Sequence, residues 1–254
     1  MTRIIGVVSG KGGVGKTTVV ANLGAVLANE FNRNTVIVDC NVTTSHLGIH
    51  MGLHYTPVTL NHVLKGEHHI YDALYEHESN VRIIPASLAV KDLSGMDLTK
   101  LRSYLQDLFG KVDFVLLDSA PGLGREALAT IHASDEVLFV TTPYLTSAMD
   151  ILRCKEVINE LDLKELSPLG LVLNMVENKK HELKSTDIEK LTELPILATI
   201  PSDRKILQSL ALKTPIVMLR PHAKPSIAFK KLGAAILKEK YKPSRFSELF
   251  GWIR

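Results

Sequence analysis

A run of nine residues near the start of the chain combines four glycines with two lysines and two threonines. Its spacing fits the pattern G-x-x-x-x-G-K-[ST], with Gly10 and Gly15 as the fixed glycines. Glycines let the backbone wrap closely around a phosphate, with consecutive N–H groups pointing inward. Lys16 is expected to reach the β- and γ-phosphates, and the Thr17 hydroxyl is expected to ligate Mg²⁺. The sequence therefore predicts a site for a nucleoside triphosphate, with ATP expected, built from Gly10, Lys11, Gly12, Gly13, Val14, Gly15, Lys16, Thr17 and Thr18.

Asp118 is a second residue of the right type for this chemistry. It ends the apolar run Phe114–Leu117, which is typical of a buried strand. A carboxylate in that place can hold Mg²⁺ through a bound water, as the Walker B aspartate of nucleotide-binding proteins does. Asp118 is therefore a predicted metal-site residue.

The elements that must position these residues alternate between strands and helices along the whole chain. The predicted strands are apolar on both faces: Ile4–Val8, Thr35–Asp39, Val81–Pro85, Phe114–Asp118, Glu136–Thr141, Pro168–Leu173 and Ile196–Ile200. The predicted helices are Lys16–Asn29, Val58–Leu64, Leu98–Leu108, Arg125–His132, Ser147–Leu161, Asp187–Leu191, Arg204–Leu210 and Ser226–Lys240. This alternation predicts one doubly wound α/β domain over residues 1–240, with a mostly parallel sheet and helices on both faces.

A second lysine in the glycine-rich loop, Lys11, gives it the form K-G-G-x-G-K-[ST]-T. This form resembles the deviant Walker A ATPases, P-loop NTPases that include the MinD and ParA proteins and the nitrogenase iron protein. In that group the first lysine crosses a dimer interface to the partner's nucleotide. The resemblance covers nearly the whole chain, and it implies that the protein forms an ATP-dependent homodimer in which Lys11 has this role.

The same resemblance assigns roles to residues that follow two predicted strands. The segment 118–122 resembles the family's switch II, D-x-x-x-G, which implies that Gly122 senses the γ-phosphate through its backbone N–H. Asp39 matches the first acidic position of switch I in archaeal MinD-like proteins, D-x-D-x-x-x-x-N-L. The resemblance therefore implies that Asp39 belongs to the catalytic and metal site.

Two positions of switch I depart from the family pattern. Asn41 stands where the family has its second aspartate, which is credited with positioning the attacking water, and His46 stands where the family has asparagine. An asparagine cannot take a proton, but it can orient a water, and phosphoryl transfer depends mainly on positioning and charge stabilisation. We therefore expect slow hydrolysis of ATP to ADP and phosphate, with Lys11, Lys16, Asp39 and Asn41 as the catalytic residues.

Three further residues match family positions near the adenine base. Asn174 follows the apolar run Leu169–Leu173 and matches an asparagine that contacts the ring, because an amide offers both a donor and an acceptor. Pro201 and Asp203 resemble the family's I-P-x-D. A plainer interpretation stays open for each side chain, since Asn174 could be an ordinary loop residue and Asp203 a helix cap.

Composition excludes several classes of protein. The chain has 254 residues, 45% hydrophobic and 22% charged, with a formal net charge of +3, values typical of a globular protein with a sizeable core. Its two cysteines, Cys40 and Cys154, do not form a C-x-x-C motif, which argues against a disulfide framework or a zinc site. No signal peptide and no membrane span are expected. We therefore expect a cytoplasmic protein.

The last residues carry an amphipathic pattern beyond Pro243, which is expected to end the preceding helix. Residues 241–254 are therefore predicted to form a linker and a short C-terminal helix. Its apolar stripe and the adjacent indole suit a membrane interface: Phe246, Leu249, Phe250, Trp252 and Ile253. MinD proteins end in a similar F-x-x-L-F-G helix that targets the membrane. The competing interpretation is a terminal helix packed on the domain's own core.

The favoured interpretation is a MinD-like ATPase that dimerises with Mg²⁺-ATP, binds the anionic inner face of the cell membrane and positions a partner protein. The identity of that cargo or activator is not encoded in any motif. A second hypothesis is a ParA-like partitioning ATPase, although 30 basic against 27 acidic residues and short basic clusters make nucleic acid an unexpected partner. Two further hypotheses are a scaffold that binds ATP with very slow turnover, and a redox carrier, which the missing family cysteines disfavour.

Overall fold

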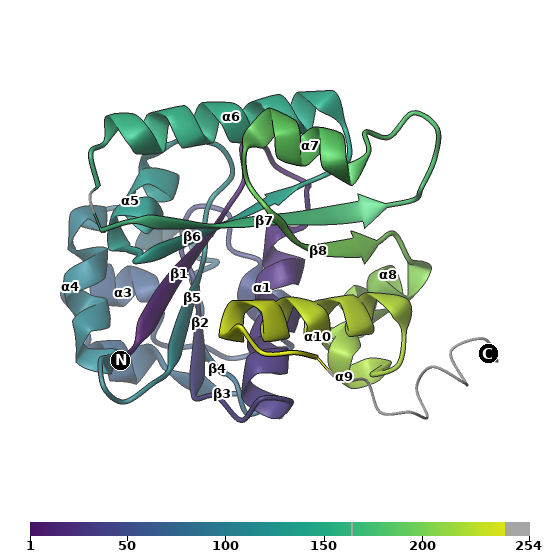
Figure 1. Ribbon diagram of the computed structural model, residues 1–254. Helices are drawn as coiled ribbons and strands as arrows, with labels where there is room; N and C mark the ends of the chain where they lie inside the picture. Colours follow the sequence, from purple (N-terminus) through teal and green to yellow (C-terminus); the bar gives the residue numbers. More distant parts are fainter. Residues whose placement is uncertain (164, 242–254) are drawn as a thin grey trace.

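A computed structural model describes residues 1–163 and 165–241, which form one eight-stranded sheet in the order β3-β4-β2-β5-β1-β6-β7-β8 (Figure 1). Every strand runs parallel to its neighbours except β3, which is antiparallel to β4. The strands are β1 (Arg3–Val8), β2 (Thr35–Asp39), β3 (Tyr75–Glu76), β4 (Arg82–Ile84), β5 (Phe114–Asp118), β6 (Glu136–Thr141), β7 (Ser167–Val176) and β8 (Ile196–Pro201). The predicted doubly wound, mostly parallel sheet is confirmed.

Helices cover both faces of this sheet (Figure 1). The α-helices are α1 (Lys16–Asn29), α2 (Leu47–His50), α3 (Leu60–Leu64), α4 (Leu101–Leu105), α5 (Arg125–Ala133), α6 (Leu145–Glu160), α7 (Ser185–Thr192), α8 (Arg204–Ala211), α9 (Ile216–Leu219) and α10 (Lys224–Leu237). Short 3₁₀ turns stand at η1 (Ile70–Ala73), η2 (Val90–Leu93), η3 (Leu98–Lys100) and η4 (Gln106–Leu108).

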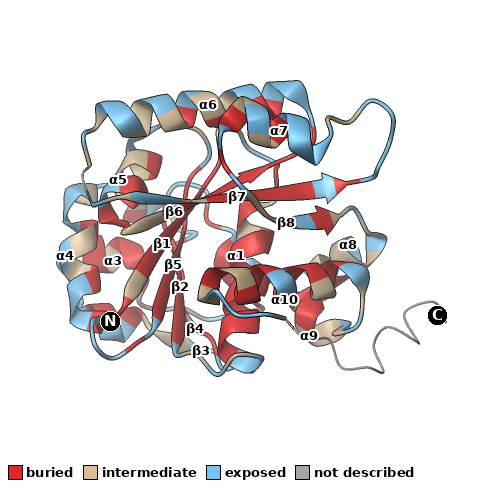
Figure 2. Cartoon of the chain, viewed as in Figure 1, coloured by how far each residue is buried: buried red, intermediate tan, exposed pale blue. Residues whose placement is uncertain are grey.

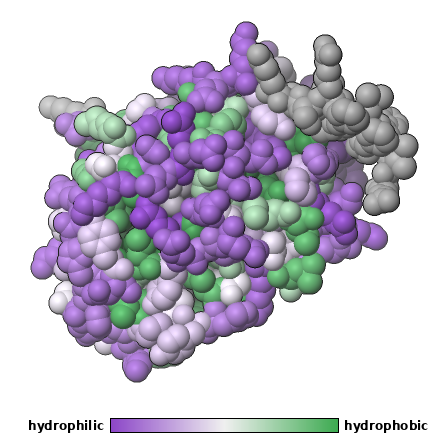
Figure 3. Space-filling model, turned by 90° about the horizontal axis from the view of Figure 1, so that it is seen from below, coloured by the Kyte–Doolittle hydropathy of each residue, from purple (hydrophilic) through white to green (hydrophobic). Residues whose placement is uncertain are grey.

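The core lies in two layers because successive strand residues point to opposite faces. On one face Ile5 and Ile37 pack with α1 and α10, which contact each other. On the other face Ile4 and Val36 pack against α3 and α4, and Phe139 packs against α6. Figure 2 shows the central strands buried along their length, and Figure 3, from below, shows hydrophobic residues reaching the surface in patches between hydrophilic ones.

Some element boundaries differ from those predicted. The strand expected to end at Leu173 continues to Val176, so Asn174 lies inside β7 and not after it. The helix predicted over 98–108 is divided into η3, α4 and η4. No sequence pattern predicts the edge strand β3, because two residues are too few to show an alternation of apolar and polar side chains. The helices α2 and α9 are likewise too short to show a helical repeat.

The last described helix ends earlier than expected. The sequence predicts a helix to Lys240 that Pro243 would stop, but α10 ends at Leu237, because Lys238 adopts a left-handed conformation with φ 57°. The predicted membrane-binding helix lies in residues 242–254, outside the described residues. Within 1–163 and 165–241, no helix is both long and apolar enough to cross a membrane.

Candidate functional site

The phosphate loop connects β1 to α1 at the carboxyl edge of the sheet, where ligands of open α/β sheets bind. Gly13 and Gly15 have φ angles of 79° and 88°, in the left-handed region that favours glycine. Gly15 is also the N-cap of α1, and α1 has no acidic residue in its first turn. The helix therefore directs its free N–H groups and the positive end of its dipole at the space inside the loop.

Gly10 is glycine because α6 leaves no room for a side chain. A Cβ atom at Gly10 would lie 2.3 Å from the Cβ of Asp150 and 2.8 Å from its carbonyl oxygen. The preceding residue, Ser9, donates from Oγ to the carbonyl of Lys11 at 2.7 Å. Asp150 thus shapes the loop although it stands on another helix. No motif marks Asp150, so it is absent from the residues predicted for this site.

Asp118 lies directly beside the phosphate loop. Within the sheet it is the register partner of Val7 on one side and of Asp39 on the other. Asp118 is 1% exposed, and burial raises its pKa to about 7, with a contribution from the charge of Asp39. A hydrogen bond from the Thr17 side chain and the charge of Lys16 oppose that rise in pKa. The structure thus brings together three predicted residues: Lys16, Thr17 and Asp118.

These residues fit a divalent cation. The Oδ1 atom of Asp118 is fully buried and has no hydrogen-bond partner among the described residues. A buried carboxylate oxygen without a partner is costly, and a hard cation that prefers oxygen ligands would satisfy it. Thr17 and Asp118 are the residues that would hold Mg²⁺. When bound there, the ion would neutralise negative charge on the phosphates.

Lys16 is almost completely enclosed, with 7% of its surface exposed. Burial lowers the pKa of its ammonium group, while the carboxylate of Asp118 acts in the opposite direction. A cation held in so dry a place gains from an anionic ligand, because Coulomb attraction is stronger where water is excluded. Lys16 is therefore placed to bind phosphate.

Asp39 holds the segment that follows β2. Its Oδ2 accepts hydrogen bonds from the Ser45 hydroxyl at 2.7 Å and from the amides of His46 and Leu47 at 3.2 and 3.1 Å. Its Oδ1 accepts from the amide of Asn41 at 3.1 Å. Burial raises the pKa of Asp39 to about 6, and these hydrogen bonds limit the rise. In this structure Asp39 anchors switch I, while its predicted catalytic and metal roles stay predictions.

Asn41 closes a small loop within the same segment. Its side-chain Nδ2 donates to the carbonyl of Thr44 at 2.8 Å, and its Oδ1 accepts from the Thr44 hydroxyl at 2.9 Å. The neighbouring Thr43 hydroxyl donates to the carboxylate of Glu126 on α5. The segment that resembles switch I is therefore tied to α5. The predicted role of Asn41 in orienting water stays a prediction.

Gly122 lies against the phosphate loop. Its backbone N–H donates to the carbonyl of Ser9 at 3.0 Å, and its φ of 75° again requires the freedom of glycine. The resemblance assigns this amide to the γ-phosphate. In this structure it donates to the carbonyl of Ser9, the residue directly before the loop. The role of Gly122 as a phosphate sensor stays a prediction.

The three residues predicted near the base occupy different positions. Asn174 is 4% exposed and lies behind the loop, where its Nδ2 donates to the carbonyl of Val14 at 2.7 Å. Pro201 ends β8, and Asp203 caps α8 by accepting from the amide of Lys205 at 2.8 Å. The capping interpretation of Asp203 is confirmed by this bond. Contact of any of the three with adenine stays a prediction.

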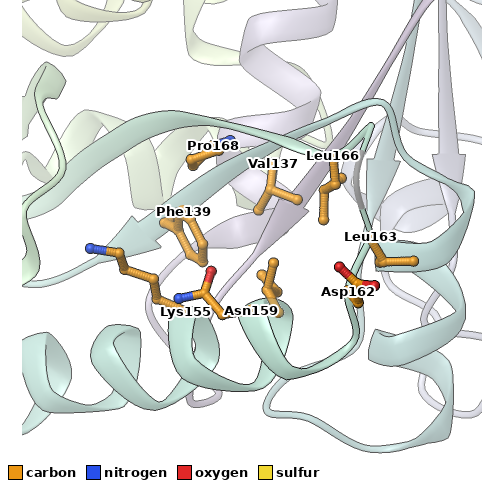
Figure 4. A pocket seen from close by; sticks show the side chains of 9 residues that line it. Val137, Phe139, Lys155, Asn159, Asp162, Leu163, Leu166 and Pro168 are labelled. Carbon is orange, nitrogen blue, oxygen red and sulfur yellow. The ribbon is translucent and has the colours of Figure 1, made fainter.

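The pocket in Figure 4 is separate from the phosphate loop. It has a volume of about 210 Å³ and lies between α6 and the amino-terminal ends of β6 and β7. Its walls are largely hydrophobic, with Val137, Phe139 and Pro168 from the strands. Lys155 at its rim donates to the carbonyl of Thr192 at 3.1 Å. Because ligands of such sheets bind beyond the carboxyl ends of the strands, we do not assign this pocket to the nucleotide.

Comparison with known proteins places this chain among nucleotide-binding proteins. Residues 5–216 match the model of the CobQ/CobB/MinD/ParA nucleotide-binding domain. An uncharacterized ATP-binding protein of Methanocaldococcus jannaschii is 32% identical over 241 residues, covering 95% of this chain and 90% of that protein.

Two solved structures are similar to this one over most of the chain. The septum site-determining protein MinD of Pyrococcus horikoshii, complexed with Mg-ADP, superposes with a TM-score of 0.88 at 33% identity, covering 93% of this chain and 96% of that one. The cell division ATPase MinD of Pyrococcus furiosus gives a TM-score of 0.89 at 34% identity, covering 94% and 99%.

Proposed function

This chain belongs to the CobQ/CobB/MinD/ParA nucleotide-binding family, and we propose that it is a MinD-like ATPase switch. In this proposal the protein binds ATP with Mg²⁺, forms a homodimer around the nucleotide and holds to the cytoplasmic face of the cell membrane through its C-terminal helix. Bound there, it positions a partner protein whose identity the chain does not reveal. Hydrolysis of ATP with water to ADP and phosphate ends this state.

One juxtaposition carries the nucleotide part of the proposal. The loop's Lys16 and Thr17 converge on the buried Asp118, whose Oδ1 lacks a partner among the described residues. A cation and two metal-binding oxygens around a glycine-rich loop are what a Mg²⁺-triphosphate requires. The similar MinD of Pyrococcus horikoshii was solved with Mg-ADP, which supports the same ligand class here.

Lys11 supports the dimer. Its side chain is half-buried, and the adjoining Gly12 and Gly13 are exposed at the tip of the loop. A lysine in this position can reach a nucleotide in a second subunit, as the deviant Walker A pattern implies. The second subunit would thereby supply a cation that stabilises charge on the transferring phosphoryl group.

The hydrogen bonds of Asn41 support slow turnover in this proposal. The Asn41 side chain bonds to Thr44, so orienting a water requires those bonds to rearrange. An amide is also no proton acceptor at neutral pH. Both features favour a long-lived ATP state, which suits a protein that must stay on a membrane long enough to recruit a partner.

The membrane part rests on the apolar stripe of residues 246–253. Four large apolar side chains repeat at helical spacing: Phe246, Leu249, Phe250 and Ile253. Such a short helix is marginal by itself in water, and its insertion binds weakly. Two copies joined in a dimer raise the effective affinity steeply, so ATP would control membrane attachment through dimerisation.

The test is sedimentation with vesicles that contain an anionic phospholipid, in ATP, ADP or no nucleotide. We expect the protein to bind the vesicles only in the presence of Mg²⁺-ATP. Binding should be lost in Lys16→Ala and in a chain that lacks residues 244–254. Phe250→Ala should weaken binding, while Phe109→Ala, at a 38% exposed phenylalanine elsewhere, should not. Equal sedimentation of the shortened chain would refute the tail as an anchor. Equal sedimentation in all nucleotide states would refute the switch.

A further inference from the structure

Charge is distributed very unevenly along the chain. Residues 196–241 contain nine lysines and arginines but only two acidic residues, a formal charge of +7. Residues 1–195 contain 18 basic and 24 acidic residues, a charge of −6. The modest net charge of +3 for the whole chain therefore conceals a strongly polarised molecule.

The positive residues form one structural unit, which we call the basic lobe: β8, α8, α9, α10 and their connections, residues 196–241. In this unit α9 packs against both α8 and α10, and α10 packs against β8. Figure 1 shows the three helices gathered on one side of the sheet, at the lower right. The described chain ends in the same unit, at Tyr241.

The two carboxylates of the basic lobe are already engaged. Asp203 accepts the amide of Lys205 as the cap of α8, and Glu239 pairs with Arg33 at 3.0 Å. One lysine is also engaged, since Lys230 pairs with Glu30. The cations that remain at the surface are exposed: Arg204, Lys213, Arg220, Lys224, Lys231, Lys238 and Lys240.

The helix α8 adds exposed hydrophobic side chains to this charge. Leu207 is 67% exposed and Leu212, directly after the helix, is 62% exposed. Cations stand on both sides of them in sequence, with Arg204 and Lys205 before and Lys213 after. In α8 only Ser209 is buried, and four of its eight residues are exposed, while Ile206 packs against the core.

A shallow groove on the same lobe repeats this combination. It lies between β8 and α10, with a volume of about 500 Å³. Leu197 and Ile227 contribute hydrophobic surface, and Lys224 and Lys231 supply ammonium groups. Exposed leucines among lysines and arginines are the arrangement by which a helix lies in the interface of an anionic membrane.

We propose that the basic lobe is a second membrane contact, in which Leu207 and Leu212 enter the headgroup region of an anionic lipid surface and the surrounding cations face the lipid phosphates. This inference rests on the proposed function, because the predicted membrane helix of residues 244–254 follows directly from the same lobe. The folded domain thereby adds affinity to a weak tail and fixes which face of the ATPase looks toward the membrane.

The exposed leucines favour lipid over nucleic acid as the occupant. Cations alone would serve either ligand, since both present a row of phosphates. Leucine side chains gain free energy by leaving water for an apolar region, which a membrane offers and a phosphate backbone does not. The continuity with an amphipathic tail points in the same direction.

The test uses the full chain with Mg²⁺-ATP and vesicles of phosphatidylglycerol mixed equally with phosphatidylcholine. One variant carries Leu207→Glu with Leu212→Glu, and its control carries Leu88→Glu, at a 70% exposed leucine outside the lobe. A second variant carries Arg204→Gln, Lys205→Gln and Lys213→Gln, and its control replaces Lys91, Lys111 and Lys190 by glutamine. Unchanged ATP affinity and melting temperature establish that each variant is folded.

We expect each lobe variant to bind the vesicles about tenfold more weakly or worse, and each control to stay within about twofold of wild type. The effect of the cation variant should fade between about 0.1 M and about 0.5 M salt, because salt screens surface charge.

Lobe variants that bind as wild type does, while loss of residues 244–254 abolishes binding, would overturn this inference and leave the proposed function standing. Wild type that never binds vesicles would overturn both. A cation variant that loses binding to duplex DNA but keeps vesicle binding would make the lobe a nucleic-acid surface and overturn the inference.

Discussion

Asp118 and Asp39 place two carboxylates side by side in a dry part of the protein. They are register partners at the ends of β5 and β2, and both are at most 1% exposed. Burial raises the pKa of Asp118 to about 7 and that of Asp39 to about 6, and each carboxylate has a negative neighbour. Two ionised carboxylates this close together repel each other, and a bound cation removes that repulsion. A Mg²⁺-nucleotide site uses carboxylates in this way.

The raised pKa of Asp118 predicts a specific dependence of stability on pH. The folded protein binds this proton more tightly than the unfolded chain, in which the carboxyl has its ordinary pKa of 3.8. Its contribution to stability is therefore full below pH 3.8 and is lost as pH rises toward about 7. In metal-free buffer, Asp118→Asn should be more stable than wild type at alkaline pH, by about 1–3 kcal/mol.

Urea unfolding in a chelator, at about pH 5 and about pH 8, measures this difference. The stability that Asp118→Asn gains over wild type should be larger at the higher pH. The control Asp187→Asn, at an exposed residue of α7, should not gain stability as pH rises. With Mg²⁺ and ATP added, wild type should become the more stable protein, because only wild type has the Asp118 carboxylate that binds the metal. A constant difference between the two pH values would contradict the assigned pKa.

At the scale of the elements, the phosphate loop takes its shape from helices on both sides of it. The α1 helix supplies the dipole, and Asp150 of α6 lies against Gly10. Asn174 of β7 donates a hydrogen bond to the carbonyl of Val14 in the loop. Switch I and α5 are joined by the bond from Thr43 to Glu126. Direct contacts therefore join the segment of residues 39–47 to α5.

Gly10→Ala tests the contact between the loop and α6. The new Cβ would lie 2.3 Å from Asp150, so the loop or the helix must move. We expect a loss of about 1–3 kcal/mol in stability and weaker ATP binding, from overpacking. Gly124→Ala is the matched control, because its Cβ would meet nothing within 4 Å and its φ is −69°. Thermal unfolding measures the stability of both variants, and calorimetric titration measures their ATP affinity. Equal values for the two variants would show that the structure accommodates the new Cβ at Gly10 without cost.

At the scale of the whole molecule, the nucleotide edge and the basic lobe give the protein two different surfaces. The phosphate loop, which contains Lys11, lies at the carboxyl edge of the sheet. Residues 196–241, which carry a formal charge of +7, form one packed unit. A dimer formed through the loop would present two basic lobes and two tails together, which multiplies weak membrane contacts.

Dimerisation with ATP is the prediction that belongs to this scale. Light scattering should show a monomer without nucleotide or with ADP, and twice that mass with Mg²⁺-ATP. Lys11→Ala should keep ATP binding, because Lys16 is retained, yet should lose both the dimer and the hydrolysis. Lys91→Ala, at an exposed lysine on η2, is the control. A single unchanged mass in every nucleotide state would rule out the dimer.

Sequence patterns were sufficient for the fold class and the phosphate loop. The alternation of apolar strands and helices predicts the parallel sheet, and Gly10–Thr18 predicts the loop between β1 and α1, because both depend on local residue types and spacing. Short elements such as β3 and α9 were not predictable, since tertiary packing and not local pattern determines them. The early end of α10 at Leu237 depends on one left-handed residue, Lys238, that no motif marks.

Only the tertiary structure decided how the site is assembled. Asp118 and Asp39 are 79 positions apart in the sequence and become neighbours only when β2 and β5 pair. The contact of Asp150 with Gly10, and the bond of Asn174 to the loop, likewise join residues that are distant in sequence. The distribution of charge depends on both levels. The sequence contains the cations of residues 196–241, but only the packing of α8, α9 and α10 brings the helices that carry them into one unit.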